Sequence, residues 1–306
     1  MRILVTGGAG FIGSHIVEHF QGRAEVRVLD NLRSGFKHNL AGLQHEFVEA
    51  SILDRDAVRR AVQGVDYIFH LAAMISVPES MAKPIECNEL NTNGTLVVLE
   101  EAAKAGVKKL VLSSSAAIYG DNPVVPKIET MFPEPKSPYA ITKLDGEYYC
   151  KMFAEEKRLQ TACLRYFNVF GPRQDPKSQY AAAVPIFIHR AVKGEPITIY
   201  GDGEQTRDFI YVKDIAAANA FFATQSSETG VYNVAYGKRI TIKELATTIC
   251  QKIGSSSEIK HALERAGDVK HSLAAIDKLR AAGFASTGSL ARGLEETIEF
   301  FSKRSA

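Results

Sequence analysis

A tyrosine and a lysine stand four residues apart in the segment SPYAITK, at Tyr139 and Lys143. On a helix this spacing places both side chains on one face. An ammonium beside a phenol stabilises the phenolate and lowers the pKa of the phenol, so the tyrosine can act as a base near neutral pH. Taken alone, the pair is equally compatible with a solvated helix face. The serines at 113–115 follow a predicted strand and add a hydroxyl that can bond a substrate hydroxyl beside the tyrosine.

A glycine-rich turn lies near the N-terminus. Gly7, Gly10 and Gly13 have the spacing GxxGxxG, and Gly8 with the last two gives GxGxxG. Glycines allow a tight turn and let the main chain approach a pyrophosphate, which the first N–H groups of the following helix can bind. The alternative is a plain tight turn. A strand is predicted before these glycines and a helix after them, which favours a dinucleotide site.

An acidic residue follows at the distance that such a site requires. Asp30 ends the next predicted strand, 20 residues after Gly10. A carboxylate there accepts hydrogen bonds from a ribose 2′-hydroxyl and repels a 2′-phosphate. The sequence therefore predicts NAD, rather than NADP, as the cofactor.

Alternating strands and helices must position these residues. Strands are predicted at residues 3–6, 26–29, 67–71, 109–113 and 197–200, and helices at residues 12–20, 57–62, 92–105, 212–224 and 290–301. Continuous apolar strands indicate a parallel sheet that is buried on both faces. The alternation in the first half of the chain predicts an α/β fold with a doubly wound parallel sheet of the Rossmann type.

Composition excludes several classes of protein. Lys and Arg number 37 and Asp and Glu 35, and a net charge of +2 offers no basic surface for nucleic acid or membranes. The four cysteines are far apart and form no CxxC, which argues against a disulfide scaffold and a zinc site. No signal peptide is recognised, and no apolar run approaches the roughly 20 residues that span a bilayer. We therefore expect a soluble cytoplasmic protein.

One motif suggests a metal site. His15 and His19, in HIVEH, have the i, i+4 spacing of an inverted zinc-protease signature. Because this helix already follows the glycine turn, we expect no metal there. His70 ends a predicted strand and is expected to be packed and hydrogen-bonded.

The glycine turn, the serines and the Tyr-Lys pair together resemble the extended branch of the short-chain dehydrogenase/reductase superfamily, and within it the nucleotide-sugar 4-epimerases. The resemblance covers almost the whole chain. It is carried by VTGGAGFIGSH (5–15), LDNLRSG (29–35), HLAA (70–73), NTNGT (91–95), SSSAAIYG (113–120), SPYAITK (137–143), LRYFNVFGPRQDP (164–176), YGDGEQTRDFIYVKDIA (200–216) and RAGDVKHS (265–272).

The resemblance implies two sets of ligand-binding residues. The expected NAD site comprises Gly7, Gly10, Phe11, Ile12, Gly13, Asp30, Asn31, Ser34, Gly35, Ile52, Leu71, Ala72, Ala73, Asn91, Ser113, Tyr139, Lys143 and Phe167. The expected UDP-sugar site comprises Ser76, Val77, Ser115, Tyr139, Asn168, Ala182, Tyr200, Arg207, Arg265, Asp268 and Ser272. In this set the two arginines match positions that bind the diphosphate, and Asp268 matches the residue that binds the ribose of the nucleotide. Ser51 stands where the family often has an aspartate that contacts adenine, which puts this one contact in doubt.

The resemblance also implies a domain organisation. Residues 1–170, with approximately 205–232 returning to them, are expected to form the Rossmann domain that binds NAD. Residues 171–204 and 233–306 are expected to form a smaller α/β domain that binds the substrate.

The implied reaction inverts C4 of a UDP-hexose. Tyr139, supported by Lys143, removes the proton of the 4-hydroxyl while hydride passes to NAD, and Ser115 orients that hydroxyl. The 4-keto sugar turns about its diphosphate link, and hydride returns to the other face. A homodimer that pairs helices near residues 92–105 and 139–155 is expected by family analogy.

Three other functions are less compatible with the sequence. Related dehydratases carry an acidic residue just after the catalytic hydroxyl, where this chain has Ala116 and Ala117. A glucuronate-specific enzyme needs an extra cation for the sugar carboxylate, and none is identified in the sequence. A non-catalytic dinucleotide sensor has no need of Ser115, Tyr139 and Lys143 together.

The sugar pocket gives a clue to the substrate. Ser272 takes a position that a large tyrosine fills in epimerases restricted to glucose and galactose, and Ala182 replaces a bulkier polar residue of some relatives. A small residue leaves room for a 2-acetamido group. We therefore expect both plain and N-acetylated UDP-hexoses to fit, the alternative being that Ser272 is merely exposed.

Overall fold

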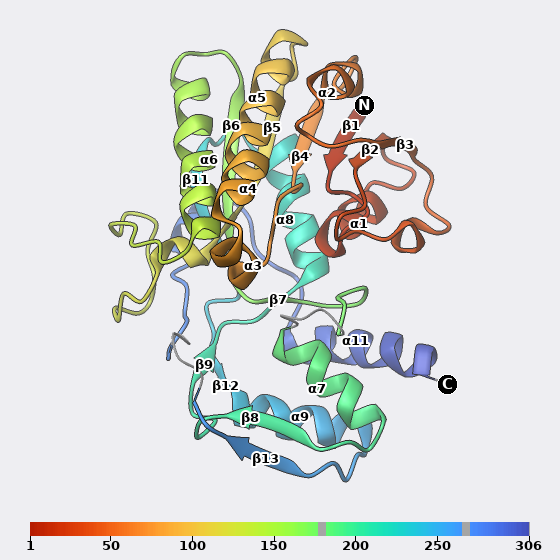
Figure 1. Cartoon of the computed structure of the whole chain (residues 1–306), viewed down its shortest axis with the longest axis vertical. Coiled ribbons are helices and arrows are strands. Elements are labelled where there is room, and N and C mark those ends of the chain that lie inside the picture. Colours follow the sequence, from red (N-terminus) through yellow and green to blue (C-terminus); the bar gives the residue numbers. More distant parts are fainter. Residues whose placement is uncertain (177–181, 265–269, 306) are drawn as a thin grey trace.

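The computed structural model describes residues 1–176, 182–264 and 270–305, with side chains up to Lys303. Its main element is a seven-stranded, all-parallel sheet with the order β11-β6-β5-β4-β1-β2-β3, shown in the upper half of Figure 1. The strands are β1 (Arg2–Thr6), β2 (Glu25–Asp30), β3 (Glu46–Glu49), β4 (Tyr67–His70), β5 (Lys109–Ser115), β6 (Gln160–Tyr166) and β11 (Gly230–Val234). The predicted doubly wound α/β fold is confirmed.

Helices cover both faces of this sheet. Ile3 and Val5 of β1 point to one face, where they pack with α1 (Phe11–His19) and α8 (Val212–Thr224). Leu4 points to the other, where α2 (Arg55–Ala61), α5 (Gly94–Lys104) and α6 (Pro138–Glu155) lie. The short helical segments of this part are η1 (Lys37–Leu40), α3 (Val77–Ala82), α4 (Pro84–Asn88), η2 (Glu89–Asn93) and η3 (Ala116–Tyr119).

The strand order determines where a ligand can bind. β1 pairs with β2 on one side and with β4 on the other. The chain therefore runs from β1 through β2 to β3 toward one edge of the sheet, and from β4 onward toward the other edge. A crevice opens at the carboxyl ends of the strands at such a switch point. Both the glycine turn after β1 and the serines at the end of β5 lie at this edge.

A smaller α/β part follows below the sheet in Figure 1. Its own core includes Val184, Ile199 and Leu245. Its elements are α7 (Ala183–Val192), β8 (Ile197–Tyr200), α9 (Ile242–Ile253), β13 (Ile259–Ala262) and α11 (Leu290–Ser305). Two short strand pairs link the parts, β7 (Val169–Phe170) with β10 (Ile210–Tyr211), and β9 (Thr206–Arg207) with β12 (Ile240–Thr241).

We propose the two-domain division of the sequence analysis with refined boundaries. The segment that returns to the sheet ends with β11, so we extend it to Val234. Leu279 of α10 (Asp277–Ala281) and Phe284 pack in the cluster under the large sheet, so we assign residues 277–284 to the NAD domain as well. In the described part of the chain, no helix is both long and apolar enough to span a membrane.

Candidate active site

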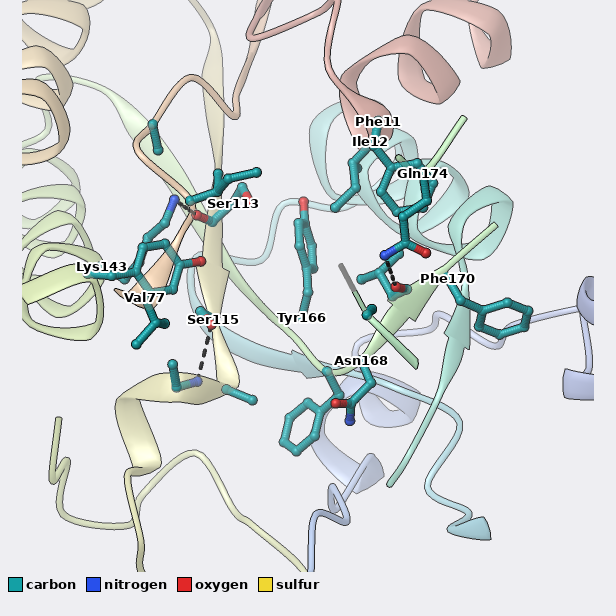
Figure 2. A pocket seen from close by; sticks show the side chains of 18 of the residues that line it. Phe11, Ile12, Val77, Ser113, Ser115, Lys143, Tyr166, Asn168, Phe170 and Gln174 are labelled. Atoms are coloured by element: carbon teal, nitrogen blue, oxygen red, sulfur yellow. Dashed lines mark hydrogen bonds between the residues drawn. The ribbon is translucent and has the colours of Figure 1, made fainter. Parts of the chain in front are cut away.

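A cavity of about 1240 Å³ lies between the two parts, at the carboxyl edge of the sheet. Figure 2 shows residues from α1, β5, α6 and the segment 166–174 around it. Most expected site residues line this cavity. They are Gly7, Gly10, Phe11, Ile12, Gly13, Asp30, Asn31, Ser34, Gly35, Ile52, Leu71, Ala72, Ala73, Val77, Ser113, Ser115, Tyr139, Lys143, Phe167, Asn168, Ala182, Tyr200, Arg207 and Ser272.

The glycine turn forms one wall and has no room for side chains. Gly7 has φ +72°, and a Cβ on it would lie 2.7 Å from the main-chain nitrogen of Ala72. A Cβ on Gly13 would lie 2.2 Å from the carbonyl oxygen of Gly7. These approaches require glycine, and they leave the bare main chain facing the cavity.

The helix that follows this turn is open to an anion. Gly10 is the N-cap of α1 and supplies no side-chain hydrogen bond, and no acidic residue lies in the first turn. The first N–H groups of the helix, at Phe11 and Ile12, are therefore not neutralised by a carboxylate. A helix N-terminus of this kind binds phosphate groups, so the turn fits the pyrophosphate of NAD.

Asp30 holds the loops around the expected ribose. Its Oδ2 accepts the N–H of Ala9 over 2.9 Å, and its Oδ1 accepts the N–H of Leu32 over 2.8 Å. Burial raises the pKa of Asp30, and these two hydrogen bonds oppose the shift. Each carboxylate oxygen keeps a further lone pair, so the group can also accept from a ribose hydroxyl.

The reactive groups lie at the end of β5 and on α6. Lys143 is almost fully buried, and its Nζ donates a hydrogen bond to the carbonyl oxygen of Ser113 over 2.7 Å, as Figure 2 shows. Ser115 caps η3, and its Oγ accepts the N–H of Ala117 over 3.1 Å. This bond uses a lone pair of the Ser115 oxygen, so the hydroxyl proton can still be donated, and Tyr139 is a hydrogen-bond partner of this serine.

The expected lowering of the phenol pKa is wrong for this structure. Burial raises the pKa of Tyr139, and a hydrogen bond with Ser115 partly offsets the shift. Burial also lowers the pKa of Lys143 to about 8. Attraction between an ammonium and a phenolate favours both charged forms, but burial removes water from both groups, and desolvation is the larger effect here.

Two expected ligand-binding residues do not line the cavity. The amide of Asn91 is buried behind the wall, where it bonds the main chain of Met74 and, over 3.0 Å, the hydroxyl of Thr142 on α6. Ser76 caps α3 by accepting the N–H of Glu79 over 3.1 Å. Through these bonds both residues hold elements of the wall in place. Ser51 does not line the cavity either, although its neighbours Ala50 and Ile52 do.

The substrate side of the cavity comes from the smaller part and from the segments that join it to the sheet. The Nδ2 of Asn168 donates to the carbonyl oxygen of Asp208 over 3.0 Å. The buried carboxylate of Asp208 accepts main-chain N–H groups of Tyr236, Gly237 and Ala274, while burial raises its pKa to about 6. Arg207, Tyr200 and Ser272 line the wall beside this brace. Arg265 and Asp268 lie outside the described residues.

Some cavity residues were not predicted from the sequence. Gln174 lines the cavity that Phe11 and Ile12 also line, and its buried Oε1 has no hydrogen-bond partner among the described residues. Tyr166 and the buried Lys127 also line the wall. Tyr166 and Gln174 lie in the segment 164–176 that resembles the epimerases, so this motif was the available signal for them. No sequence signal marks Lys127, because its place depends on how distant loops fold together.

The histidines of the suspected metal motif are engaged in other contacts. The Nε2 of His15 lies 2.9 Å from the carbonyl oxygen of Pro172, and burial lowers the pKa of His15. Within the described ranges, no group of three or more His, Cys, Asp or Glu is placed to hold a metal. His70 bonds Thr6 and Thr95, and burial lowers its pKa to about 3, so the packed histidine is confirmed.

Comparison with known proteins adds independent information. Residues 3–235 match the model of the family described as "NAD dependent epimerase/dehydratase family". A putative UDP-glucose 4-epimerase of Methanocaldococcus jannaschii is 37% identical over 301 residues, which cover 97% of each chain.

Two solved structures are similar over the full length. A UDP-N-acetylglucosamine 4-epimerase from Methanobrevibacter ruminantium, in complex with UDP-N-acetylmuramic acid, is 43% identical with a TM-score of 0.96, over 99% of this chain and 98% of its own. A UDP-glucose 4-epimerase from Thermotoga maritima, with UDP-glucose, is 41% identical with a TM-score of 0.95, over the whole of both chains.

Proposed function

The chain belongs to the NAD-dependent epimerase/dehydratase family, and from this premise we propose that it inverts C4 of a UDP-hexose through a transient 4-keto sugar. NAD is its cofactor. One observation carries the proposal: the glycine turn, Ser115, Tyr139 and Lys143 open into a single cavity that is large enough for a dinucleotide and a nucleotide sugar together. A dinucleotide sensor would need only the first of these features.

We assign the proton transfer to Tyr139. Its phenolate accepts the proton of the sugar 4-hydroxyl and returns a proton to that oxygen after the sugar has turned. Ser115, which hydrogen-bonds Tyr139 in the structure, turns its hydroxyl to donate a hydrogen bond to the same sugar oxygen and thereby orients it. Bound NAD supplies the acceptor and donor of the C4 hydride. Lys143, held by the carbonyl of Ser113, places a positive charge beside the phenol and favours its ionised form.

The nucleotide must be held while the sugar turns. Asn168, Tyr200 and Arg207 line the substrate side, and the Asp208 carboxylate braces the loops behind them. An arginine suits a diphosphate because its planar donors match phosphate oxygens. Binding energy concentrated on the nucleotide leaves the sugar free to present either face to the cofactor.

Dehydration is the second candidate, since the family name includes it. A dehydratase needs an acid next to the catalytic hydroxyl, and Ala116 and Ala117 line the cavity there instead. Among the described residues, the acidic side chains that line the cavity belong to Asp30, at the cofactor end, and to the exposed Asp121. This arrangement favours epimerisation.

We propose that N-acetylated sugars are substrates as well. Ser272 and Ala182 both line the cavity, and neither has a bulky side chain. A 2-acetamido group therefore meets little steric resistance at either wall. The complex of the Methanobrevibacter relative with an N-acetylated UDP-sugar supports this assignment.

We also propose a homodimer in the cytoplasm. Ile141, Tyr148 and Met152 lie on one side of α6 and are 47%, 58% and 38% exposed. This spacing forms an apolar stripe along the helix. A second copy of the chain is the occupant that would cover it, since the same stripe on both subunits makes a self-complementary surface.

The test is incubation of the purified protein with UDP-glucose and, separately, UDP-N-acetylglucosamine, without added NAD. The proposal expects UDP-galactose and UDP-N-acetylgalactosamine by chromatography, with NAD recovered from the denatured protein. A 4-keto-6-deoxy product would instead show a dehydratase. No conversion of either sugar, by a protein that contains NAD, would contradict the proposed function.

A further inference from the structure

Lys127 is a buried cation in the wall of the active-site cavity. Its side chain is 3% exposed, and the residue lines the cavity together with Gly120 and Asp121 of the loop after η3. Of the cationic residues that line this cavity within the described ranges, Lys127 and Lys143 are buried to this degree. Lys143 belongs to the proposed proton-transfer machinery, whereas the proposed reaction gives Lys127 no role.

The ammonium of Lys127 has spare hydrogen-bonding capacity. Its Nζ donates to the carbonyl oxygen of Asn122, and no carboxylate in the described part of the chain lies within ion-pair distance. Burial lowers the pKa of Lys127, and the exposed Glu134 opposes this shift from a greater distance. An ammonium has three donors, so two remain for a ligand. A buried cation without an anion is costly, and a bound carboxylate would compensate it.

The main chain fixes Lys127 next to the sugar side of the cavity. Its N–H donates to the carbonyl of Leu273 over 2.8 Å, and its carbonyl accepts the N–H of Ala275 over 2.8 Å. These bonds place Lys127 beside the segment that begins with the cavity residue Ser272. The Nδ2 of Asn233 donates a further hydrogen bond to the Lys127 carbonyl oxygen, over 2.9 Å. The position is therefore rigid, as a specific binding group requires.

The other charges at this end of the cavity leave it cationic. Lys136 lines the cavity, is exposed and has no ion-pair partner among the described residues, and Asp121 is the acidic residue there. Exposed charges such as that of Lys136 are screened by water, whereas an ion pair with the buried Lys127 would be screened much less.

We propose that Lys127 binds a carboxylate carried by the hexose, so that the enzyme takes acidic UDP-sugars in addition to neutral ones. The inference rests on the proposed function and specifies its substrate class. The carboxylate can sit at C6, as in a hexuronic acid, or on a lactyl ether, as in N-acetylmuramic acid. The two carboxylates carry the same charge, and they differ in their distance from C4 of the sugar.

The experiment compares binding of four ligands by calorimetry to the NAD-containing enzyme: UDP, UDP-N-acetylglucosamine, UDP-glucuronic acid and UDP-N-acetylmuramic acid. Lys127→Met removes the charge at similar length, Lys127→Arg keeps it, and Lys136→Met is the matched exposed control. We expect Lys127→Met to weaken at least one acidic ligand by about tenfold to a hundredfold more than the neutral one, the range for a charge-assisted hydrogen bond. We expect Lys127→Arg to recover most of this loss. The acidic ligand whose affinity falls in Lys127→Met identifies the position of the carboxylate.

An equal loss of neutral and acidic ligands in Lys127→Met would overturn the inference, because it would show a structural role in the loop. So would a wild-type enzyme that binds both acidic ligands no better than Lys127→Met does. A separate measurement of UDP-hexose epimerisation distinguishes failure of this inference from failure of the proposed function. A protein that epimerises no UDP-hexose but shows the charge-dependent difference in binding would contradict the function and keep the carboxylate site.

Discussion

The Nζ of Lys143 lies 5.7 Å from the centre of the Tyr139 ring, while it donates a hydrogen bond to the carbonyl of Ser113 over 2.7 Å. The strand end thus holds the ammonium beside the phenol. Burial acts against both charged forms, since it raises the pKa of Tyr139 and lowers that of Lys143 to about 8. The proposed proton transfer therefore requires the lysine charge to favour the phenolate against this burial.

This relationship predicts how the pH profile responds to Lys143→Met. A general base works deprotonated, so kcat/KM should rise with pH as the phenol ionises. Loss of the adjacent cation disfavours the phenolate, so the rising limb should move to higher pH by about one unit or more, each unit being about 1.4 kcal/mol. The measurement is the pH dependence of kcat/KM. The exposed Lys151→Met on the same helix is the control, and an unchanged limb in Lys143→Met would refute the assignment.

Replacement of Tyr139 by phenylalanine should abolish the proton transfer without disturbing the fold. The expected loss in kcat is about 10² to 10⁴-fold, the usual contribution of a general base. NAD content and thermal stability should stay close to those of the wild type. Tyr148→Phe, an exposed phenol on the same helix, should keep its activity. Comparable activity of the two variants would exclude Tyr139 as the base.

The fold could be predicted well from the sequence where periodicity is strong. The strand at 197–200 and the helix at 212–224 match β8 and α8 to the residue. Three strands of the large sheet, β3, β6 and β11, were not predicted, and neither were the short strands that join the two parts. β3 has no fully buried residue, and β11 starts at a glycine, so neither shows a long apolar run. Their existence depends on pairing with distant strands, which local patterns do not encode.

The site was predictable where spacing fixes geometry and less so elsewhere. The glycine turn and the Tyr-Lys pair are local motifs, and both line the cavity as expected. Asn91 lies behind the wall instead, because a short π-helical segment at Glu89–Asn93 and its bonds to Met74 set its direction. Lys127 lines the cavity because its main chain pairs with that of Ala274, 147 positions along the sequence. No sequence motif predicts this pairing.

The width of the sugar pocket predicts the effect of Ser272→Tyr. The large side chain should fill the space for a 2-acetamido group, so turnover of UDP-N-acetylglucosamine should be lost while UDP-glucose is spared. Steady-state kinetics with both sugars measures the difference. An equal loss for the two would show that residue 272 does not discriminate between them.

The apolar stripe on α6 predicts the oligomeric state. Ile141→Glu combined with Met152→Glu should convert the dimer to a monomer, because charges would have to be buried at the centre of the interface. Light scattering coupled to size-exclusion chromatography measures the mass. Leu263→Glu, which places a charge at an exposed apolar residue of the smaller part, should leave the dimer intact. A wild-type protein that is monomeric at micromolar concentration would contradict the proposal.

The most direct test of the central claim follows the hydrogen at C4. UDP-glucose labelled with deuterium at C4 is incubated with the enzyme in ordinary water without added NAD, and the products are read by mass spectrometry and NMR. We expect UDP-galactose that retains deuterium at C4, because the same hydride leaves and returns within one cavity. Absence of the 4-epimer, or a product that has lost its C4 deuterium to water, would contradict it.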